Sequence, residues 1–232
     1  MSAELTISEQ GQIADRYDAA VEKLVDDSVD VRRGAIYSMQ SIMTDSPRMQ
    51  PAVIDMLSKY VRDRATKTPV LVEKAPDIRA ALYTLGNRDP SHDGKAVIDL
   101  GGVRLRKVDL NGVDLTSANL EKAVLSDGDL EKADLSGADL ESAVLTGVRL
   151  TGADLTNSYV KRADLRGADL TGADLSGADL TETKLARANL TGTIWKCTNL
   201  SGANRPEGDL PDVTSSMAPD RSRSPGCDGT LP

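Results

Sequence analysis

Apolar residues recur at every fifth position through the second half of this chain. From Leu100 to Leu200 the count runs without an insertion, and 19 of its 21 positions are leucine. The exceptions are Val160 and Trp195. The residue two places before each position is small or branched, the residue one place before is often aspartate, and the two residues after are mostly polar or glycine. A five-residue block is therefore the unit of this segment.

A period of five fits neither a regular helix nor a flat strand. On an α-helix, five residues turn the chain about 140° beyond a full circle, so the leucines would spread around the axis. On a strand, successive leucines would alternate between the two faces, because five is odd. The leucines share one side only if the backbone bends within every block, and glycines such as Gly167 and Gly172 suit such corners. The pattern predicts a solenoid whose stacked coils enclose an apolar interior.

The first 92 residues lack this period and have the apolar spacing of helices. Ile13, Tyr17 and Leu24 predict a first helix that follows the candidate caps Thr6 and Ser8. Residues 29–43, 51–64 and 75–86 predict three more amphipathic helices.

Proline and glycine mark the ends of these predicted helices. Pro51 is placed as a first-turn proline, and Gly86 ends the last helix. Residues 86–95 then predict a turn-rich linker. We expect the helical segment to seal the first coil, because the terminal coils of a solenoid need covering.

The blocks read A-(D/N)-L-x-x, as in ADLSGADLESAVL and ANLTGTIWKCTNL. In this pattern the segment from Ala96 to Asn204 resembles the pentapeptide-repeat family. The resemblance implies a mainly β solenoid, a right-handed quadrilateral β-helix with four blocks per coil and about five coils, preceded by an all-α N-terminal domain. The expected parts are residues 1–94 (helical domain and linker), 95–204 (β-helix) and 205–232, a polar tail that we expect to be disordered.

Candidate catalytic chemistry is sparse. The one histidine, His92, lies in the linker beside Ser91 and Asp93, but neighbours in sequence do not supply the geometry of a catalytic triad. The sequence has no Gly-rich phosphate loop and no cluster of histidines and cysteines with metal-ligand spacing. The two cysteines, Cys197 and Cys227, are expected as reduced thiols. We therefore expect no enzymatic activity, no metal and no cofactor.

The formal net charge of −8 argues against generic binding to nucleic acid or to an anionic membrane. No uninterrupted apolar stretch approaches the thickness of a bilayer, and the N-terminus lacks the pattern of a signal peptide. A cytoplasmic location is expected.

With four blocks per coil, residues 20 apart stack into columns, so the outward charges divide among four faces. One face has a net charge of −3, from Lys196 and the column Asp114, Asp134, Asp154 and Asp174. The opposite face has a net charge of +4, from Asp127 and Asp164 against Arg104, Arg106, Lys107, Arg166, Lys184 and Arg187. On that face Val124 and Val144 occupy outward positions and are candidates for docking the helical domain. The remaining two faces carry −3 and −2.

These observations favour a non-enzymatic cytoplasmic scaffold that presents a rigid charged surface to a protein partner. The alternative is a DNA mimic, because some pentapeptide-repeat proteins bind DNA gyrase and related topoisomerases and protect them against inhibitors. The aspartates of the acidic face would then carry the binding. A solenoid with one basic face is a weaker likeness of DNA than a rod that is acidic all round.

An exposed apolar side chain near the last coil predicts self-association. Ile194 points outward and Trp195 replaces the inward leucine of the same block. An uncovered terminal coil is an open sheet edge, which proteins usually cover or pair. We expect a homodimer through the C-terminal coil, unless Trp195 suffices as a lid over its own core.

Overall fold

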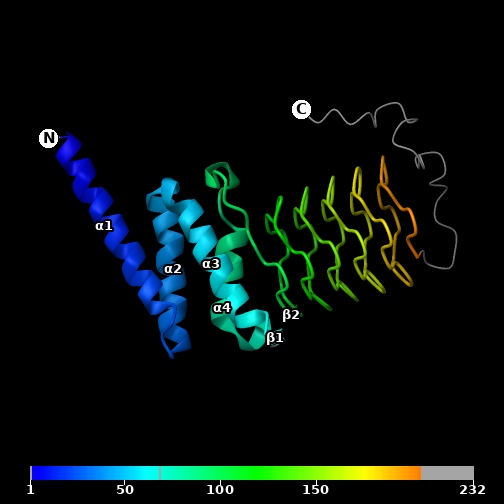
Figure 1. The fold of residues 1–232 in the computed structure, drawn as a ribbon, viewed down its shortest axis with the longest axis horizontal. Helices are drawn as coiled ribbons and strands as arrows, with labels where there is room; N and C mark the ends of the chain where they lie inside the picture. The colour runs from blue at the N-terminus through cyan, green and yellow to red at the C-terminus, as the bar shows by residue number, and fades with distance from the viewer. Residues whose placement is uncertain (1, 68, 205–232) are drawn as a thin grey trace.

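The protein, described here by a computed structural model for residues 2–67 and 69–204, consists of a layer of helices followed by a column of stacked coils (Figure 1). The helices are α1 (Ser2–Lys23), α2 (Val29–Asp45), α3 (Gln50–Ala65) and α4 (Pro76–Gly86). All four of the helices expected from the sequence are present. Three 3-10 turns lie in the connections: η1 (Pro47–Met49) between α2 and α3, η2 (Val72–Lys74) before α4, and η3 (Pro90–His92) between α4 and the coils.

The ends of the helices follow local sequence signals with one exception. Ser28 caps α2, because its side chain accepts a hydrogen bond from the amide of Val31. Proline lies in the first turn of both α3 and α4, where its missing N–H costs nothing. The caps predicted at Thr6 and Ser8 are wrong, since α1 already begins at Ser2 and a cap must lie outside the helix.

A buried ionic cluster ties three of the helices together. The Arg32 guanidinium of α2 donates to Asp77 of α4 over 2.7 Å, and the hydroxyl of Tyr60 on α3 donates to the same carboxylate over 2.6 Å. Burial of Asp77 acts to raise its pKa, but the hydrogen bonds from Tyr60 and Arg32 outweigh burial and hold that pKa below its usual range. Burial, with Asp77 beside it, raises the pKa of Tyr60 to about 12.

The coils repeat every 20 residues. Parallel bridges join residues 20 apart without a gap, from Asp99 with Asn119 to Lys184 with Asn204. Each bridge has the same backbone bonds: the amide of Leu135, for example, donates to the carbonyl of Asp154 over 2.7 Å. Four blocks therefore complete one coil. Within the described ranges only β1 (Val70–Leu71) and β2 (Leu105–Arg106) are longer than a single bridge residue.

The bend within each block comes from one backbone conformation. The second residue after every leucine position has a positive φ, which turns the chain at a left-handed corner. Glycine is the residue best suited to that corner, as at Gly177 with a φ of 73°. Lysine, arginine or serine occupies it in several blocks, for example Lys107 with a φ of 52°. The five-residue period therefore arises from this left-handed backbone conformation. Glycine adopts it most easily, but other residues adopt it in several blocks.

The interior of the coils is built as the spacing predicts. The leucines and the alanines two places before them are almost fully buried, as Leu155 and Ala153 illustrate. The first coil has larger residues at the alanine places, Ile98, Val103, Val108 and Val113, where the helices cover it. Gly128 follows Val108 in one inner column, where an added Cβ would lie 2.8 Å from the carbonyl oxygen of Leu125 and 3.1 Å from Cγ1 of Val108, so glycine leaves room for that valine.

The helical layer seals the first coil by backbone pairing. β1 pairs in parallel with β2 and so extends the stack of coils toward the helices. Beside this pair, the amide of Arg104 donates to the carbonyl of Ala65 over 2.7 Å. The amide of Asp114 donates to the carbonyl of Gly86 over 3.0 Å. The helices thus cover the first coil, as expected. Val124 and Val144 stay partly exposed, and the backbone bonds from the helical layer reach residues of the first coil instead.

Arg88 fastens the linker to this junction, a role that the sequence did not reveal. Its side chain is 2% exposed. It binds the carboxylate of Asp93 through two nitrogens and donates to the carbonyls of Leu85 and Asp114. The predicted linker is therefore an ordered joint between α4 and the first coil.

One expectation about the cysteines is wrong. Cys197 is disulfide-bonded and not a reduced thiol. Cys227 and the tail 205–232 lie outside the described residues.

Candidate functional site

The four aspartates predicted to form an acidic face do stand in one column. Bridges link Asp114 to Asp134, Asp134 to Asp154 and Asp154 to Asp174, and Ile194 follows on the next coil. Adjacent members are one coil apart, about 4.8 Å at the usual strand spacing. We call Asp114, Asp134, Asp154 and Asp174 the acidic column.

Each aspartate of the acidic column also has a structural role. Its Oδ1 accepts a hydrogen bond from the amide two residues later, over 3.0 Å at Asp114 and 2.8 Å at Asp154. The same bond recurs at other blocks, and at Asn119 an amide oxygen makes it instead of a carboxylate. Aspartate at this position therefore stabilises the corner, and its charge is not required for the turn.

The neighbouring faces differ from the acidic column in that their bases are paired, although Asp109, Asp139 and Asp169 on them also have no salt bridge among the described residues. On the face of Asp99 and Asp139 the bases are paired, with Lys122 to Glu121, Lys161 to Asp179 and Arg162 to Glu141. On the face of Asp109 and Asp169, Arg149 and Lys132 are paired with Asp129 and Glu131. Within the described part of the chain, Asp134, Asp154 and Asp174 have no salt bridge, and Asp114 approaches Arg88 only at 3.8 Å.

The face two blocks away carries the opposite charge. Its outward residues centre on one stacked column, from Arg104 through Val124, Val144 and Asp164 to Lys184. We call this the basic face. Both of its acids are neutralised within it, since Arg106 binds Asp127 over 2.9 Å and Arg166 binds Asp164 over 2.6 Å.

The predicted dimer residues lie as the spacing requires. Ile194 is 50% exposed on the column that continues from Asp174. Trp195 points inward and is only 5% exposed, and its indole N–H has no acceptor within the described residues. Exposed apolar surface at this block therefore comes from Ile194.

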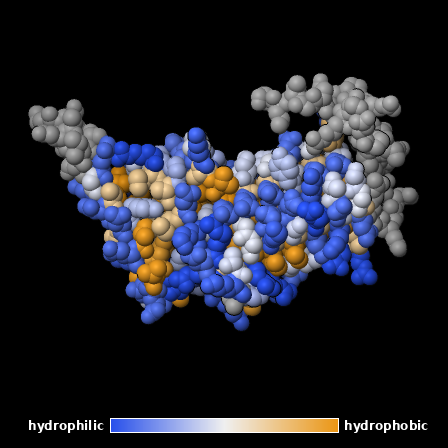
Figure 2. All heavy atoms as spheres, in the orientation of Figure 1, coloured by the Kyte–Doolittle hydropathy of each residue, from blue (hydrophilic) through white to orange (hydrophobic). Residues whose placement is uncertain are grey.

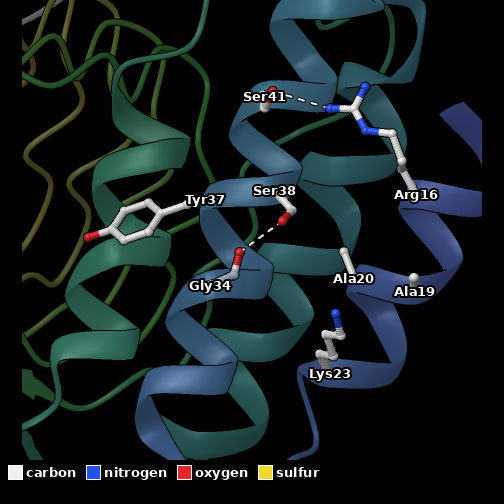
Figure 3. A pocket seen from close by; sticks show the side chains of 8 residues that line it. All are labelled: Arg16, Ala19, Ala20, Lys23, Gly34, Tyr37, Ser38 and Ser41. Carbon is white, nitrogen blue, oxygen red and sulfur yellow. Dashed lines mark hydrogen bonds between the residues drawn. The ribbon is translucent and has the colours of Figure 1, made fainter.

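A groove with a volume of about 430 Å³ lies between α1 and α2 (Figure 3). Arg16 and Lys23 stand on the α1 side, and the Arg16 guanidinium donates to the Ser41 hydroxyl over 3.2 Å. Arg16 also forms an ion pair with Asp45 at 2.8 Å. Ser38 donates to the carbonyl of Gly34, so the polar groups of the groove are largely satisfied by one another.

His92 of the linker is not arranged as the base of a catalytic triad. The hydroxyl of Ser91 donates to Asp89 over 2.7 Å, and Nδ1 of His92 lies 3.2 Å from that hydroxyl and 3.1 Å from Asp89. A triad needs the two ring nitrogens to face different partners, whereas Nδ1 meets both here. These side chains, at the N-cap of η3 and on it, are exposed to solvent.

Other kinds of site are likewise missing from the part of the chain that the structure describes. It contains no group of three or more metal-ligating side chains. No described helix combines the length and the apolar character needed to cross a membrane. In the view of Figure 2 the coils expose mostly hydrophilic surface, with larger hydrophobic patches over the helices.

The family "Pentapeptide repeats" matches the coils in eight copies, over residues 98–137, 129–160, 149–185, 159–194 and 183–204. The repeat segment belongs to the pentapeptide-repeat family. Proteins of this family fold as right-handed quadrilateral β-helices and generally act as binding scaffolds without catalytic activity. No curated protein matches the chain.

Several solved structures of pentapeptide-repeat proteins are similar to parts of the chain. One from Nostoc PCC 7120 is 36% identical, with 48% of this chain and 82% of that chain covered and a TM-score of 0.22. One from the thylakoid lumen of Arabidopsis thaliana is 31% identical, with 47% and 69% covered and a TM-score of 0.22. QnrB1, a plasmid-mediated fluoroquinolone resistance protein, is 17% identical, with 50% and 73% covered and a TM-score of 0.26. These TM-scores are too low to support an argument about function.

Proposed function

We propose that this chain is a non-enzymatic binding scaffold, in which a right-handed quadrilateral β-helix of about five coils presents a rigid charged surface to a protein partner. The observation that carries the proposal is the unbroken series of bridges between residues 20 apart, from residue 99 to residue 204. It fixes outward side chains in straight columns. Pentapeptide-repeat proteins often mediate protein interactions, which supports the same conclusion.

Rigid columns suit a scaffold for an energetic reason. Association costs conformational entropy at the interface. A surface whose backbone is hydrogen-bonded on every coil is already ordered, so it loses little conformational entropy on binding. Charges at fixed spacing also give specificity and speed the approach of a complementary partner.

Photo-cross-linking with a matched control tests the scaffold proposal. A photoreactive amino acid is placed in separate variants at outward Thr156, on the face of the acidic column, and at outward Thr146, on the basic face, with samples kept in the dark as the control. We expect a single adduct from one of the two positions in living cells and saturable binding when the partner is purified and recombined with the chain. Labelling at both positions that matches the dark control, with no saturable partner, would contradict the proposal.

A second candidate function is protection of DNA gyrase or another topoisomerase by DNA mimicry. The observation that favours it is the acidic column, in which three successive carboxylates have no ion pair within the described residues. Such a column would present unneutralised negative charge to a basic DNA-binding groove. The basic face weighs against full mimicry, because a DNA analogue should be acidic around most of its girth.

Replacement of the acidic column by asparagine separates the two candidates. Asparagine keeps the oxygen that caps each corner, as Asn119 shows, so the fold should survive. If mimicry is correct, the parent protects gyrase from a fluoroquinolone in a supercoiling assay and the fourfold variant does not. If the parent itself does not bind gyrase, mimicry is excluded and the scaffold proposal stands alone.

A further inference from the structure

The basic face carries unpaired positive charge in two separate places. Arg104 and Lys107 are exposed on the first coil, and Lys184 and Arg187 are exposed near the last. None of these four has a salt bridge among the described residues, unlike Arg106 and Arg166 beside them. The other bases of residues 95–204 without a salt bridge among the described residues are Lys95, before the first coil, and Lys196, on the acidic face. The net +4 of this face therefore resides in two pairs of bases.

The distance between the two pairs follows from the coil repeat. Arg104 and Lys184 belong to one column and are four coils apart. At about 4.8 Å per coil, roughly 19 Å separates them. An extended peptide covers that distance with about six residues, since each adds about 3.3 Å.

The surface between the two pairs is small and partly apolar. Val124 and Val144 are neighbours in the column and partly exposed, and the hydroxyl of Thr146 donates to that of Ser126. Both acids in this region are already occupied by arginine. The hydrogen bonds from Arg166 in particular lower the pKa of Asp164, so that carboxylate stays charged and paired. Leu71, 39% exposed, pairs with Arg106 and extends the apolar surface toward the helices.

We propose that the basic face binds an extended acidic polypeptide segment, with acidic residues at both ends and small apolar residues between them. Each acidic end would meet one pair of bases, and the apolar centre would cover Val124 and Val144. This inference rests on the scaffold function proposed above and names the chemistry of its partner.

Other polyanions fit this surface less well. A nucleic-acid strand carries evenly spaced phosphates, whereas here the charge is interrupted by two valines and two neutralised arginines. An anionic membrane would require apolar side chains that protrude, and both valines are only partly exposed. The acidic segment is the occupant with both the right charge and the right spacing.

Each pair of bases can be replaced by residues that occupy the same positions in other blocks of the coils. Lys107 and Arg187 have φ values of 52° and 61°, so glycine at either position fits the corner better. Asparagine occupies the position of Arg104 and Lys184 in other blocks, for example at Asn119. The variants are therefore Arg104→Asn with Lys107→Gly, and Lys184→Asn with Arg187→Gly. The matched control is Lys132→Gly with Lys161→Ser, which removes the same charge from other faces.

The experiment measures fluorescence anisotropy of the full chain with a labelled peptide, GEESVSVSEEG. We expect saturable binding at low ionic strength, and the affinity should fall as salt is added. Each paired variant should bind about tenfold more weakly than the parent, which is the change expected from the loss of one strong charge contact. The control variant should bind like the parent. A peptide with all its glutamates at one end, GEEEESVSVSG, should bind more weakly because it reaches only one pair.

Three results would overturn the inference. The first is no saturable binding of GEESVSVSEEG, and the second is equal affinity for GEEEESVSVSG. The third is tighter binding of oligo(dT) or phosphatidylserine vesicles than of GEESVSVSEEG. Failure here is distinguishable from failure of the scaffold function. If the cross-linked partner still binds both paired variants like the parent, the scaffold function stands and only the assignment of the basic face is wrong.

Discussion

Gly86 and Val113 meet with no space between them at the junction of helix and coil. A Cβ built on Gly86 would lie 2.6 Å from both Cβ and Cγ1 of Val113, closer than side-chain atoms ever approach. The carbonyl of Gly86 also accepts a hydrogen bond from the backbone amide of Asp114. The last residue of α4 thus serves as the contact surface on which the first coil rests.

Gly86→Ala should therefore weaken this junction. Overpacking in a core costs about 1–3 kcal/mol, and we expect a loss of that size in the free energy of unfolding by urea. The matched control is Gly34→Ala in α2, where an added Cβ meets nothing within 4 Å. The control should be neutral or stabilising by up to about 1 kcal/mol, because alanine is the better helix former. Equal stability of both variants would show that the junction can move apart.

The interior of the coils offers a second prediction. Leu155 is fully buried in a middle coil, and Leu155→Asp would place an uncompensated carboxylate among apolar side chains. We expect the cooperative unfolding transition to disappear from circular dichroism. Thr156→Asp, on the adjacent outward position, should keep the transition. An unchanged melt of Leu155→Asp would mean that the inward register is wrong.

Asp77 predicts how the helical layer responds to acid. Its pKa is lowered in the folded state, so the stability it contributes is present above the ordinary carboxyl pKa, near 3.9, and is lost as the pH falls through the folded value. The parent should therefore lose helical stability below about pH 4. Asp77→Asn should lower the free energy of unfolding by about 3 kcal/mol at neutral pH, because Arg32 is left buried without its carboxylate partner. The same variant should show a shallower fall in stability in acid, and an unchanged pH profile would assign the acid response to other carboxylates.

The fold was largely predictable because its signals are local. The five-residue period placed Leu155 and Ala153 inside, and apolar spacing located all four helices. The start of α1 was missed, since Thr6 and Ser8 look like caps although the helix continues before them. The left-handed corner at residues such as Lys107 was also missed, because lysine gives no sign of a positive φ.

The electrostatic features of the coils were only partly predictable. The acidic column followed from the count of four blocks per coil, which the resemblance to the pentapeptide-repeat family implied and the period itself did not. The pairing of Arg162 with Glu141 depends on where long side chains reach between coils, which no spacing rule supplies. Arg88 lay in a segment that looked like an ordinary linker, and its burial became evident only from its contacts with Asp93 and Asp114.

The C-terminal coil provides the last prediction. Ile194 is half exposed where the four preceding coils carry aspartate, and we expect two chains to pair through this end. Ile194→Asp restores the residue of the acidic column, so the coil should fold normally.

The control for this dimer is Tyr159→Asp. Tyr159 is 56% exposed in the equivalent position of another column, away from the last coil. Light scattering over a concentration series should give a dimer for the parent and for Tyr159→Asp, and a folded monomer for Ile194→Asp. Because the interface is small, the dimer should dissociate on dilution. A parent that stays monomeric at high concentration would mean that the buried indole of Trp195 is a sufficient cover for its own core.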